Sequence, residues 1–261
     1  MTPDDSRFAF KCDLAAPPGA RVIKEEPRTR VWVQDVPEGG RAVVKVYRHR
    51  KNADVLLRPP LTYAVQREFN ALARLQACGV PCSEPLFWTC GKSPEHGRYE
   101  MLGTREVPDA IDLRELILSG ADPDRDIDLR PLFQVVRKMH AAGVFHGALC
   151  ARNVLFADGG YHIIDMPRSL VFRSSIEGSL AAMTDMLSLC HFICYASGGT
   201  PERLPVDAYG WDERQRAGFL DRYSRYRRSH GQRYGVRLRI LAGHSWSRLR
   251  RTAGPQTAGT A

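Results

Sequence analysis

Two charged residues occupy positions that the sequence pattern assigns to apolar faces. The segments TRVWVQD and RAVVKVY, within residues 29–47, are rich in β-branched residues, and the turn-forming VPEGG between them predicts a β-hairpin. Lys45 stands between two valines of the second segment, and Glu68 falls on the apolar stripe of a helix predicted at 63–77. The strand pattern alone also fits an exposed Lys45. An unpaired buried carboxylate is costly, however, so we predict that Lys45 and Glu68 pair.

Two short strands later in the chain give a second constraint. The segments NVLF and YHIID, separated by the turn ADGG, predict a hairpin with Asn153 at one end and Asp165 at the other. The side chains of these two residues can therefore converge. Amide and carboxylate oxygens are ligands that Mg²⁺ takes in proteins, so we predict that Asn153 and Asp165 hold a magnesium ion.

These motifs follow one another as they do in the protein-kinase-like fold. Lys45, Glu68, the stretch MHAAGVFHG with Asn153 after it, and the IID that ends at Asp165 resemble that fold over about residues 28–195. REFNALARLQACGVP and IIDMPRS are most similar to the lipopolysaccharide kinase family, which phosphorylates Kdo or heptose sugars of the lipopolysaccharide core. The resemblance implies an α+β, two-lobed protein-kinase-like fold with a small β-rich N-lobe and a mainly helical C-lobe.

The resemblance also implies ATP and Mg²⁺ as cofactors. In that fold the strand lysine, here Lys45, holds the nucleotide phosphates and pairs with the helix glutamate, here Glu68. The glycine-rich loop that precedes this lysine in protein kinases is replaced by EEPRTR. Arg28 and Arg30 of this segment could reach the phosphates, or they could form a solvated basic turn.

A further implied role belongs to Asp185, which lies inside the most apolar helical segment, SLAAMTDMLSLCHFICYA. In the resembling fold such a carboxylate anchors the catalytic loop by accepting hydrogen bonds from its backbone. We expect His146 to belong to the same buried network as a loop anchor and not as a base. An Asp in mid-bilayer costs about 2.5–3.5 kcal/mol, so we predict a buried core helix here and not a membrane span.

The loop HGALCARNVL, residues 146–155, departs from the kinase pattern at its third residue. Ala148 stands where kinase-type loops carry the Asp that accepts the proton of the nucleophile. General-base catalysis contributes about 10²–10⁴-fold to such reactions. Two functions stay open: a kinase that phosphorylates a sugar hydroxyl of lipopolysaccharide core or another small-molecule acceptor, and a pseudokinase that binds nucleotide as a scaffold or regulator. The short stretch between Asp165 and Asp185 leaves little room for an activation loop, which argues against a conventional protein kinase.

The net charge of +9 and the pI of about 9.4 favour an anionic partner. The segment 222–251 contains ten arginines interleaved with aromatic and aliphatic residues. This composition suits an anionic lipid surface or the phosphates of a sugar or lipid acceptor such as lipopolysaccharide core. No recognition motif supports nucleic-acid binding.

We divide the chain into an N-terminal extension (1–27), an N-lobe (28–107), a C-lobe with basic C-terminal helices (108–250) and a disordered tail (251–261). The N-terminal residues MTPDDSRFAFKCD lack the basic start and apolar core of a signal peptide. We therefore expect a cytoplasmic protein, with peripheral contact at the inner face of the membrane through the Arg-rich segment.

Overall fold

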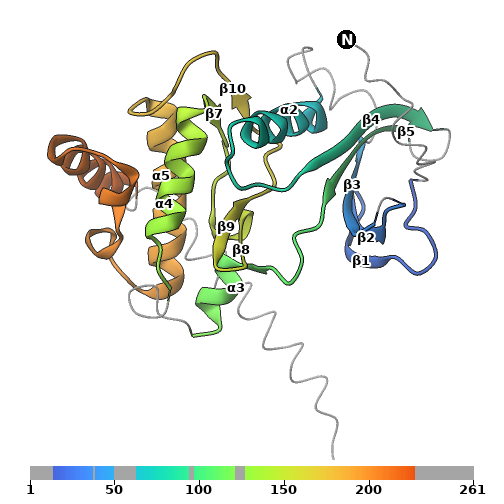
Figure 1. Ribbon diagram of the computed structural model, residues 1–261, viewed down its shortest axis with the longest axis horizontal. Helices are drawn as coiled ribbons and strands as arrows, with labels where there is room; N and C mark the ends of the chain where they lie inside the picture. Colours follow the sequence, from blue (N-terminus) through green and yellow to red (C-terminus); the bar gives the residue numbers. More distant parts are fainter. Residues whose placement is uncertain (1–13, 38, 50–62, 94–96, 121–126, 227–261) are drawn as a thin grey trace, which may run out of the picture.

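The computed structural model describes a β-rich part and a helical part of the chain (Figure 1). The described residues are 14–37, 39–49, 63–93, 97–120 and 127–226. Most of the Arg-rich segment, from residue 227 on, lies outside the described residues, as does the predicted disordered tail.

A five-stranded antiparallel sheet forms the β-rich part, in the order β1-β2-β3-β5-β4. Its strands are β1 (Arg21–Glu26), β2 (Thr29–Asp35), β3 (Arg41–His49), β4 (Pro85–Ser93) and β5 (Gly97–Arg105). The predicted hairpin is confirmed as β2 and β3. Strand β1 lies within 1–27, the range assigned to an N-terminal extension. All six residues of β1 are exposed, so this edge strand pairs through its main chain and carries no apolar alternation to predict it.

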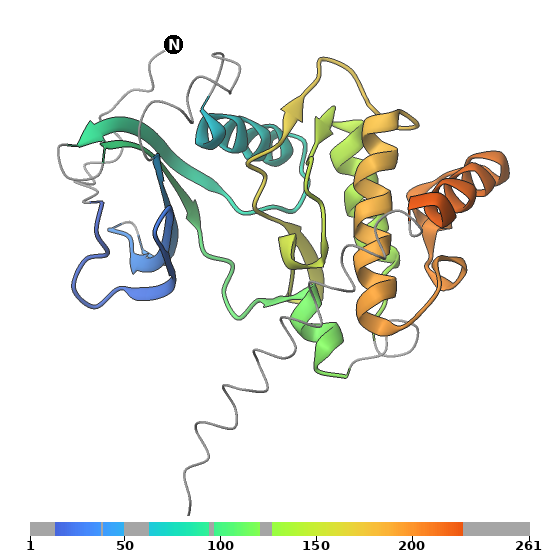
Figure 2. The ribbon, with the colours of Figure 1, turned by 180° about the vertical axis from the view of Figure 1, so that it is seen from behind.

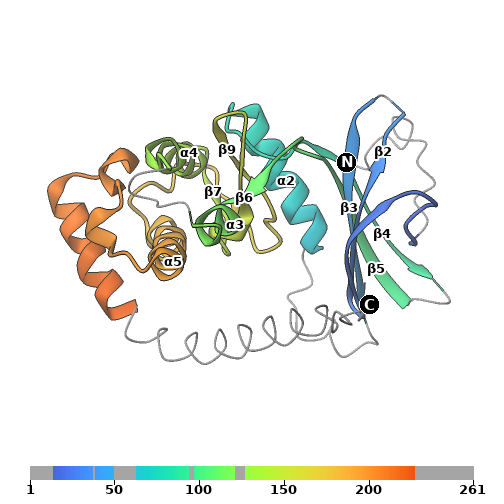
Figure 3. The ribbon, with the colours of Figure 1, turned by 90° about the horizontal axis from the view of Figure 1, so that it is seen from below.

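Strand β3 separates two chemical environments. Ala42, Val44 and Val46 are fully buried in the sheet core, which they share with Trp32 and Met101. Successive side chains of a strand point to opposite faces, so Lys45 lies on the other face of the sheet. Helix α2 (Ala64–Ala77) lies between the sheet and the helical part (Figure 3).

Helix α2 begins and ends close to the predicted limits. Three residues of the expected apolar stripe, Val65, Leu72 and Leu75, are buried together with Glu68. The fourth, Phe69, is partly exposed. The Tyr63 side chain makes no capping hydrogen bond at the start of the helix.

The helical part has a larger apolar core, to which α4 and α5 both contribute. The two helices run side by side (Figures 1 and 2). A further helix, at 213–226, lies at the end of the molecule far from the sheet. The elements are β6 (Ile111–Asp112), α3 (Leu113–Leu118), α4 (Arg130–Ala141), β7 (Val144–Phe145), η1 (Ala151–Asn153), β8 (Val154–Ala157), β9 (Gly160–Ile163), β10 (Leu170–Val171), α5 (Leu180–Ser197), η2 (Pro201–Arg203) and η3 (Val206–Tyr209).

Helix α5 is the apolar segment in which Asp185 was found. Ser179 caps it by accepting a hydrogen bond from the Ala182 backbone N–H at 3.2 Å. Within the described residues, α5 is the one helix whose length and composition would let it cross a membrane. Met186, Leu189 and Ile193 are fully buried against the rest of the core, as expected of a core helix.

Candidate active site

Three residues from distant parts of the sequence meet at one ammonium group. The Nζ atom of Lys45 lies 2.9 Å from Glu68 Oε1 and 2.8 Å from Asp165 Oδ1. The predicted pair of Lys45 with Glu68 is therefore present. The sequence did not predict the contact with Asp165. Glu68 is almost fully buried, with 1% of its side chain exposed, whereas 41% of the Asp165 side chain is exposed.

The charges of these three groups depend on one another. Burial alone would lower the pKa of Lys45, but the carboxylates of Glu68 and Asp165 outweigh it and raise that pKa. Burial raises the pKa of Glu68, an effect that the Lys45 ammonium opposes without cancelling it. Burial would also raise the pKa of Asp165, but Lys45 outweighs burial there and the pKa lies below its ordinary value. Lys45 is thus a fixed cation, and Asp165 is a fixed and partly exposed anion.

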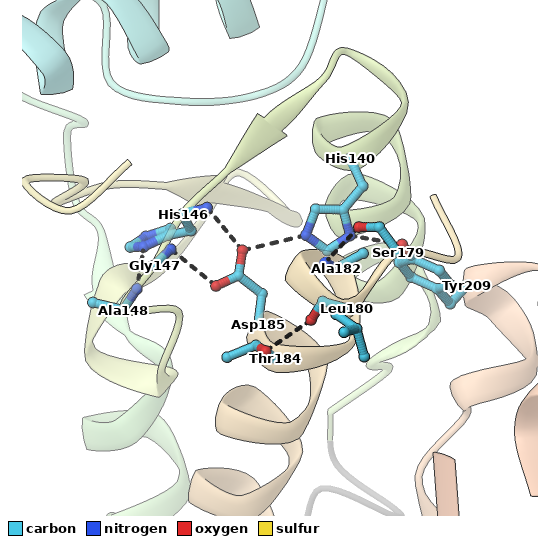
Figure 4. Close-up of polar contacts among 10 residues, drawn as sticks. All are labelled: His140, His146, Gly147, Ala148, Ser179, Leu180, Ala182, Thr184, Asp185 and Tyr209. Atoms are coloured by element: carbon cyan, nitrogen blue, oxygen red, sulfur yellow. Dashed lines mark hydrogen bonds and ion pairs between the residues drawn. The ribbon is translucent and has the colours of Figure 1, made fainter. Parts of the chain in front are cut away.

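The loop after β7 is held by its backbone (Figure 4). The N–H groups of His146 and Gly147 donate to the two oxygens of Asp185, at 2.7 and 3.0 Å. Asp185 is 1% exposed, so its charge is directed at these donors and not at solvent. This is the anchoring contact that the sequence resemblance implied.

Asp185 also belongs to a hydrogen-bond network with His140 and Tyr209, which the sequence did not predict. His140 Nε2 lies 3.3 Å from Asp185 Oδ2, and His140 Nδ1 lies 2.6 Å from the Tyr209 hydroxyl (Figure 4). In the neutral imidazole, the Nε2 proton goes to Asp185 and Nδ1 accepts from Tyr209. His140 and Tyr209 are both buried. His140 lies among the buried residues of α4, and this position could have indicated that it has a buried partner. No local sequence pattern marks Tyr209.

His146 has both ring nitrogens engaged. Its Nδ1 accepts from the Ala148 backbone N–H at 3.3 Å, so Nε2 carries the proton and donates to the Ile164 carbonyl at 3.1 Å. Burial lowers the pKa of His146 and outweighs the opposing charges of Asp185 and Asp165. The His146 ring thus has no free lone pair and links the loop to the Ile164 carbonyl.

Gly147 brings the loop against the segment that follows Asp165. Its φ is +76°, and a Cβ atom there would lie 2.6 Å from the Arg168 carbonyl oxygen. Only glycine tolerates both the left-handed backbone and this close approach. The main chain of Arg168 therefore packs directly beside the residue that precedes Ala148.

Asn153 and Asp165 lie where the hairpin of β8 and β9 begins and ends. The Ile164 N–H donates to the Asn153 carbonyl at 3.0 Å, so the two strand ends are adjacent. Asn153 Nδ2 donates to the Ala148 carbonyl at 2.9 Å, which leaves the side-chain oxygen of Asn153 available. Asp165 has a φ of 59°, a left-handed conformation that costs a non-glycine residue about 1–3 kcal/mol and that is concentrated at functional sites.

This donor pair is chemically suited to a magnesium ion. Mg²⁺ is usually held by one or two carboxylates together with substrate phosphates and water, and it does not need a cage of protein ligands. In the part of the chain that the structure describes, no group of three or more His, Cys, Asp or Glu side chains could hold a metal. The oxygens of Asn153 and Asp165 thus fit Mg²⁺ together with phosphate, and they do not fit an independent metal centre.

Arg28 and Arg30, which could reach the phosphates or form a basic turn, lie in different settings. Arg30 is paired in register with Val46, so it lies on the face of the sheet opposite Lys45, where its guanidinium contacts Glu25. Arg28 lies in the turn between β1 and β2, and its carbonyl accepts from the Arg48 backbone N–H at 2.9 Å. The structure does not bring Arg30 to the Lys45 face.

The comparison with known families agrees with this arrangement. The model of the "Lipopolysaccharide kinase (Kdo/WaaP) family" matches residues 17–174, a range that contains Lys45, Glu68, the HGA loop and Asp165. The chain belongs to this lipopolysaccharide kinase family. Asp185 and Tyr209 lie beyond the matched range. The structure is also similar to a solved structure described as "WaaP in complex with acyl carrier protein", with a TM-score of 0.57 and 19% sequence identity, over 80% of this chain and 88% of that chain. This likeness confirms the kinase-like α+β fold.

Proposed function

We propose that this lipopolysaccharide kinase family member binds Mg-ATP between its sheet and its helical part and transfers phosphate to an acceptor related to lipopolysaccharide core. The observation that carries the proposal is the position of Lys45, which touches Glu68 on one side and Asp165 on the other. A fixed cation beside a partly exposed carboxylate is what a nucleotide phosphate and its metal ion require.

Each residue of the site has a distinct role in this proposal. Lys45 donates to the nucleotide phosphates, and Glu68 keeps its side chain directed at them. Asn153 and Asp165 hold Mg²⁺, which when bound would neutralise charge on the phosphates. Asp185 fixes the loop that carries Ala148 through the two backbone hydrogen bonds described above.

Ala148 affects the rate of transfer to a hydroxyl acceptor. A sugar hydroxyl must lose its proton during transfer, and Ala148 offers no atom to accept it. We therefore expect transfer to a sugar hydroxyl to be slower, by about 10²–10⁴-fold, than in a loop that carries a base. The same residue supports the second candidate function, a pseudokinase that binds nucleotide and acts as a scaffold or regulator.

The location of the protein is part of the proposal. The net charge of +9 suits an anionic sugar or lipid acceptor, and we place the protein in the cytoplasm, at the inner face of the membrane. The Arg-rich segment 222–251 would provide the peripheral contact.

A thermal-shift titration with Mg-ATP tests the nucleotide site. We expect the wild-type protein to be stabilised at millimolar Mg-ATP and Asp165→Asn to lose that shift. Asp158→Asn is the matched control, because Asp158 is also an aspartate with positive φ, 49°, and lies at the turn of the same hairpin. Asparagine tolerates the left-handed backbone at both positions. A wild-type protein that shows no shift would exclude the nucleotide site.

A further inference from the structure

The described residues around Ala148 include no imidazole or carboxylate that is not already engaged. Both ring nitrogens of His146 are engaged, and both oxygens of Asp185 accept from the loop backbone. Glu68 is buried on Lys45, and the Asp165 carboxylate is held by the same ammonium. A hydroxyl acceptor would therefore keep its proton late into the transfer step.

Two exposed arginines lie next to residues of the site in the chain. Arg152 is exposed and lies on η1, directly before Asn153 in the sequence. Arg168 is also exposed, and its main chain packs against Gly147. No salt bridge involves either arginine within the described residues. Two unpaired cations beside a loop without a base favour an acceptor that arrives as an anion.

From this combination we infer that the acceptor atom is an oxygen of a phosphomonoester, already ionised before transfer, and not a sugar hydroxyl. The inference rests on the proposed function and specifies its acceptor. A phosphomonoester carries about −1.5 to −2 charges near neutral pH, so no base is needed to expose a lone pair. Arg152 and Arg168 would offset the repulsion between this anion and the nucleotide.

The reaction balances without a proton acceptor. A lone pair of the acceptor phosphate oxygen forms a bond to the γ-phosphorus of ATP. The bond between that phosphorus and the β,γ-bridging oxygen breaks, and the electron pair leaves with ADP. The product is a phosphoanhydride on the acceptor, and no proton leaves the acceptor at any stage.

Transfer from γ-labelled ATP to matched acceptors tests the inference. The acceptors are purified lipopolysaccharide core before and after phosphatase treatment, glucose 6-phosphate, glucose and inorganic phosphate. We expect phosphorylated acceptors to react at least about 10²-fold faster than their dephosphorylated forms, which is the advantage of not needing a base. A diphosphate signal in the ³¹P spectrum identifies the product. Faster reaction of glucose 6-phosphate than of inorganic phosphate would identify a phosphorylated sugar, and not free phosphate, as the acceptor class.

Three variants sharpen the test. Ala148→Asp should raise transfer to the dephosphorylated acceptors and lower transfer to the phosphorylated ones, because its carboxylate would repel the anionic acceptor. Arg152→Gln should lower transfer to phosphorylated acceptors by about tenfold, the effect of losing one charged hydrogen bond. Arg214→Gln removes an equally exposed arginine from the helix far from the sheet and should change neither.

Three outcomes would overturn the inference. Equal rates for phosphorylated and dephosphorylated acceptors would show that ionisation is not needed, and loss of transfer in Cys150→Ser would show that a thiol supplies the base. Binding of Mg-ATP without transfer to any acceptor would also overturn it, while leaving the nucleotide site and the pseudokinase function standing. Absence of Mg-ATP binding would instead overturn the proposed function itself.

Discussion

Lys45 Nζ lies 2.8 Å from Asp165 Oδ1, although the two residues are 120 positions apart in the sequence. This ion pair joins the third strand of the sheet to the end of the β8–β9 hairpin. Glu68 makes it a triad, so the charge balance of the site depends on both parts of the molecule.

Lys45→Met should destabilise the fold by about 3 kcal/mol, because it leaves the buried Glu68 carboxylate without its partner. The double variant Lys45→Met with Glu68→Met should recover much of that loss, since neither charge is then buried. Urea denaturation of the single and double variants measures both effects. Lys24→Met is the control, because Lys24 pairs with Glu26 at the exposed edge strand and its loss should cost less than about 1 kcal/mol. A Lys45→Met protein as stable as the wild type would contradict the triad.

The Tyr209 hydroxyl should stabilise the loop at His146 and Gly147 through His140 and Asp185. Tyr209→Phe keeps the ring but leaves His140 Nδ1 without its donor, which weakens the hold of His140 on Asp185. We expect amide hydrogen exchange at His146 and Gly147 to rise by about tenfold, consistent with the loss of one buried hydrogen bond.

Tyr161→Phe provides a matched control for that experiment. Tyr161 is also 2% exposed, and its hydroxyl donates to the Asp128 carbonyl at 2.7 Å, away from the loop. This variant should lose a similar amount of stability without faster exchange at the loop. Equal exchange at the loop in the two variants would show that Tyr209 acts only on global stability.

Stability should fall on mild acidification because of His146. Burial places the folded-state pKa of His146 below the unfolded-state value of about 6.5, so the unfolded chain binds the proton more tightly. The contribution of His146 is therefore complete above pH 6.5 and is lost as the pH falls toward the folded-state pKa. The slope can reach about 1.4 kcal/mol per pH unit.

Denaturation curves between pH 5 and pH 8 measure this slope. Burial also lowers the pKa of His162, so His162→Asn separates its contribution from that of His146. The slope should shrink in His146→Asn. An unchanged slope in that variant would assign the acid sensitivity to other groups.

Ala148→Asp should raise phosphate transfer to a sugar hydroxyl by about 10²–10⁴-fold. Ala148 is partly exposed beside a loop that Asp185 already holds, so the carboxylate needs no burial and should cost little stability. Turnover with dephosphorylated lipopolysaccharide core and Mg-ATP measures the gain. If the variant folds, binds Mg-ATP and transfers nothing to sugar, lipid or protein acceptors, the acceptor site is also lost and the pseudokinase function replaces the enzymatic one.

The Arg-rich segment 222–251 should bind anionic lipid. Co-sedimentation of the full chain with anionic vesicles should weaken as salt rises, since exposed charges are screened over about 8 Å at physiological ionic strength. Vesicles of neutral lipid should retain little protein at any salt concentration. Equal retention by the two vesicle types would assign the contact to apolar residues instead.

The sequence predicted the parts of the site that depend on periodicity. Alternation placed Lys45 on the face of β3 opposite the buried valines, and the helical stripe placed Glu68 toward it. Contacts between distant segments left no such pattern. Asp165 could be assigned to the end of a hairpin, but nothing local showed that its left-handed backbone would direct it to Lys45. Arg30 was predicted near the phosphates from its charge, whereas its strand register places it on the opposite face.

The pairing of Lys45 with Asp165 also affects how an anion can bind. The Lys45 ammonium already has a counter-ion in the folded protein. The free-energy cost of removing this ammonium from bulk water is therefore part of the free energy of folding. A nucleotide phosphate that reaches Lys45 therefore exchanges with a resident carboxylate and does not encounter a bare charge. The affinity of the site for a phosphate then depends on how much more strongly Lys45 interacts with that phosphate than with the Asp165 carboxylate. An anion that interacts with Lys45 no more strongly than a carboxylate does would not displace Asp165. The ion pair therefore favours the binding of highly charged phosphate chains over that of singly charged anions.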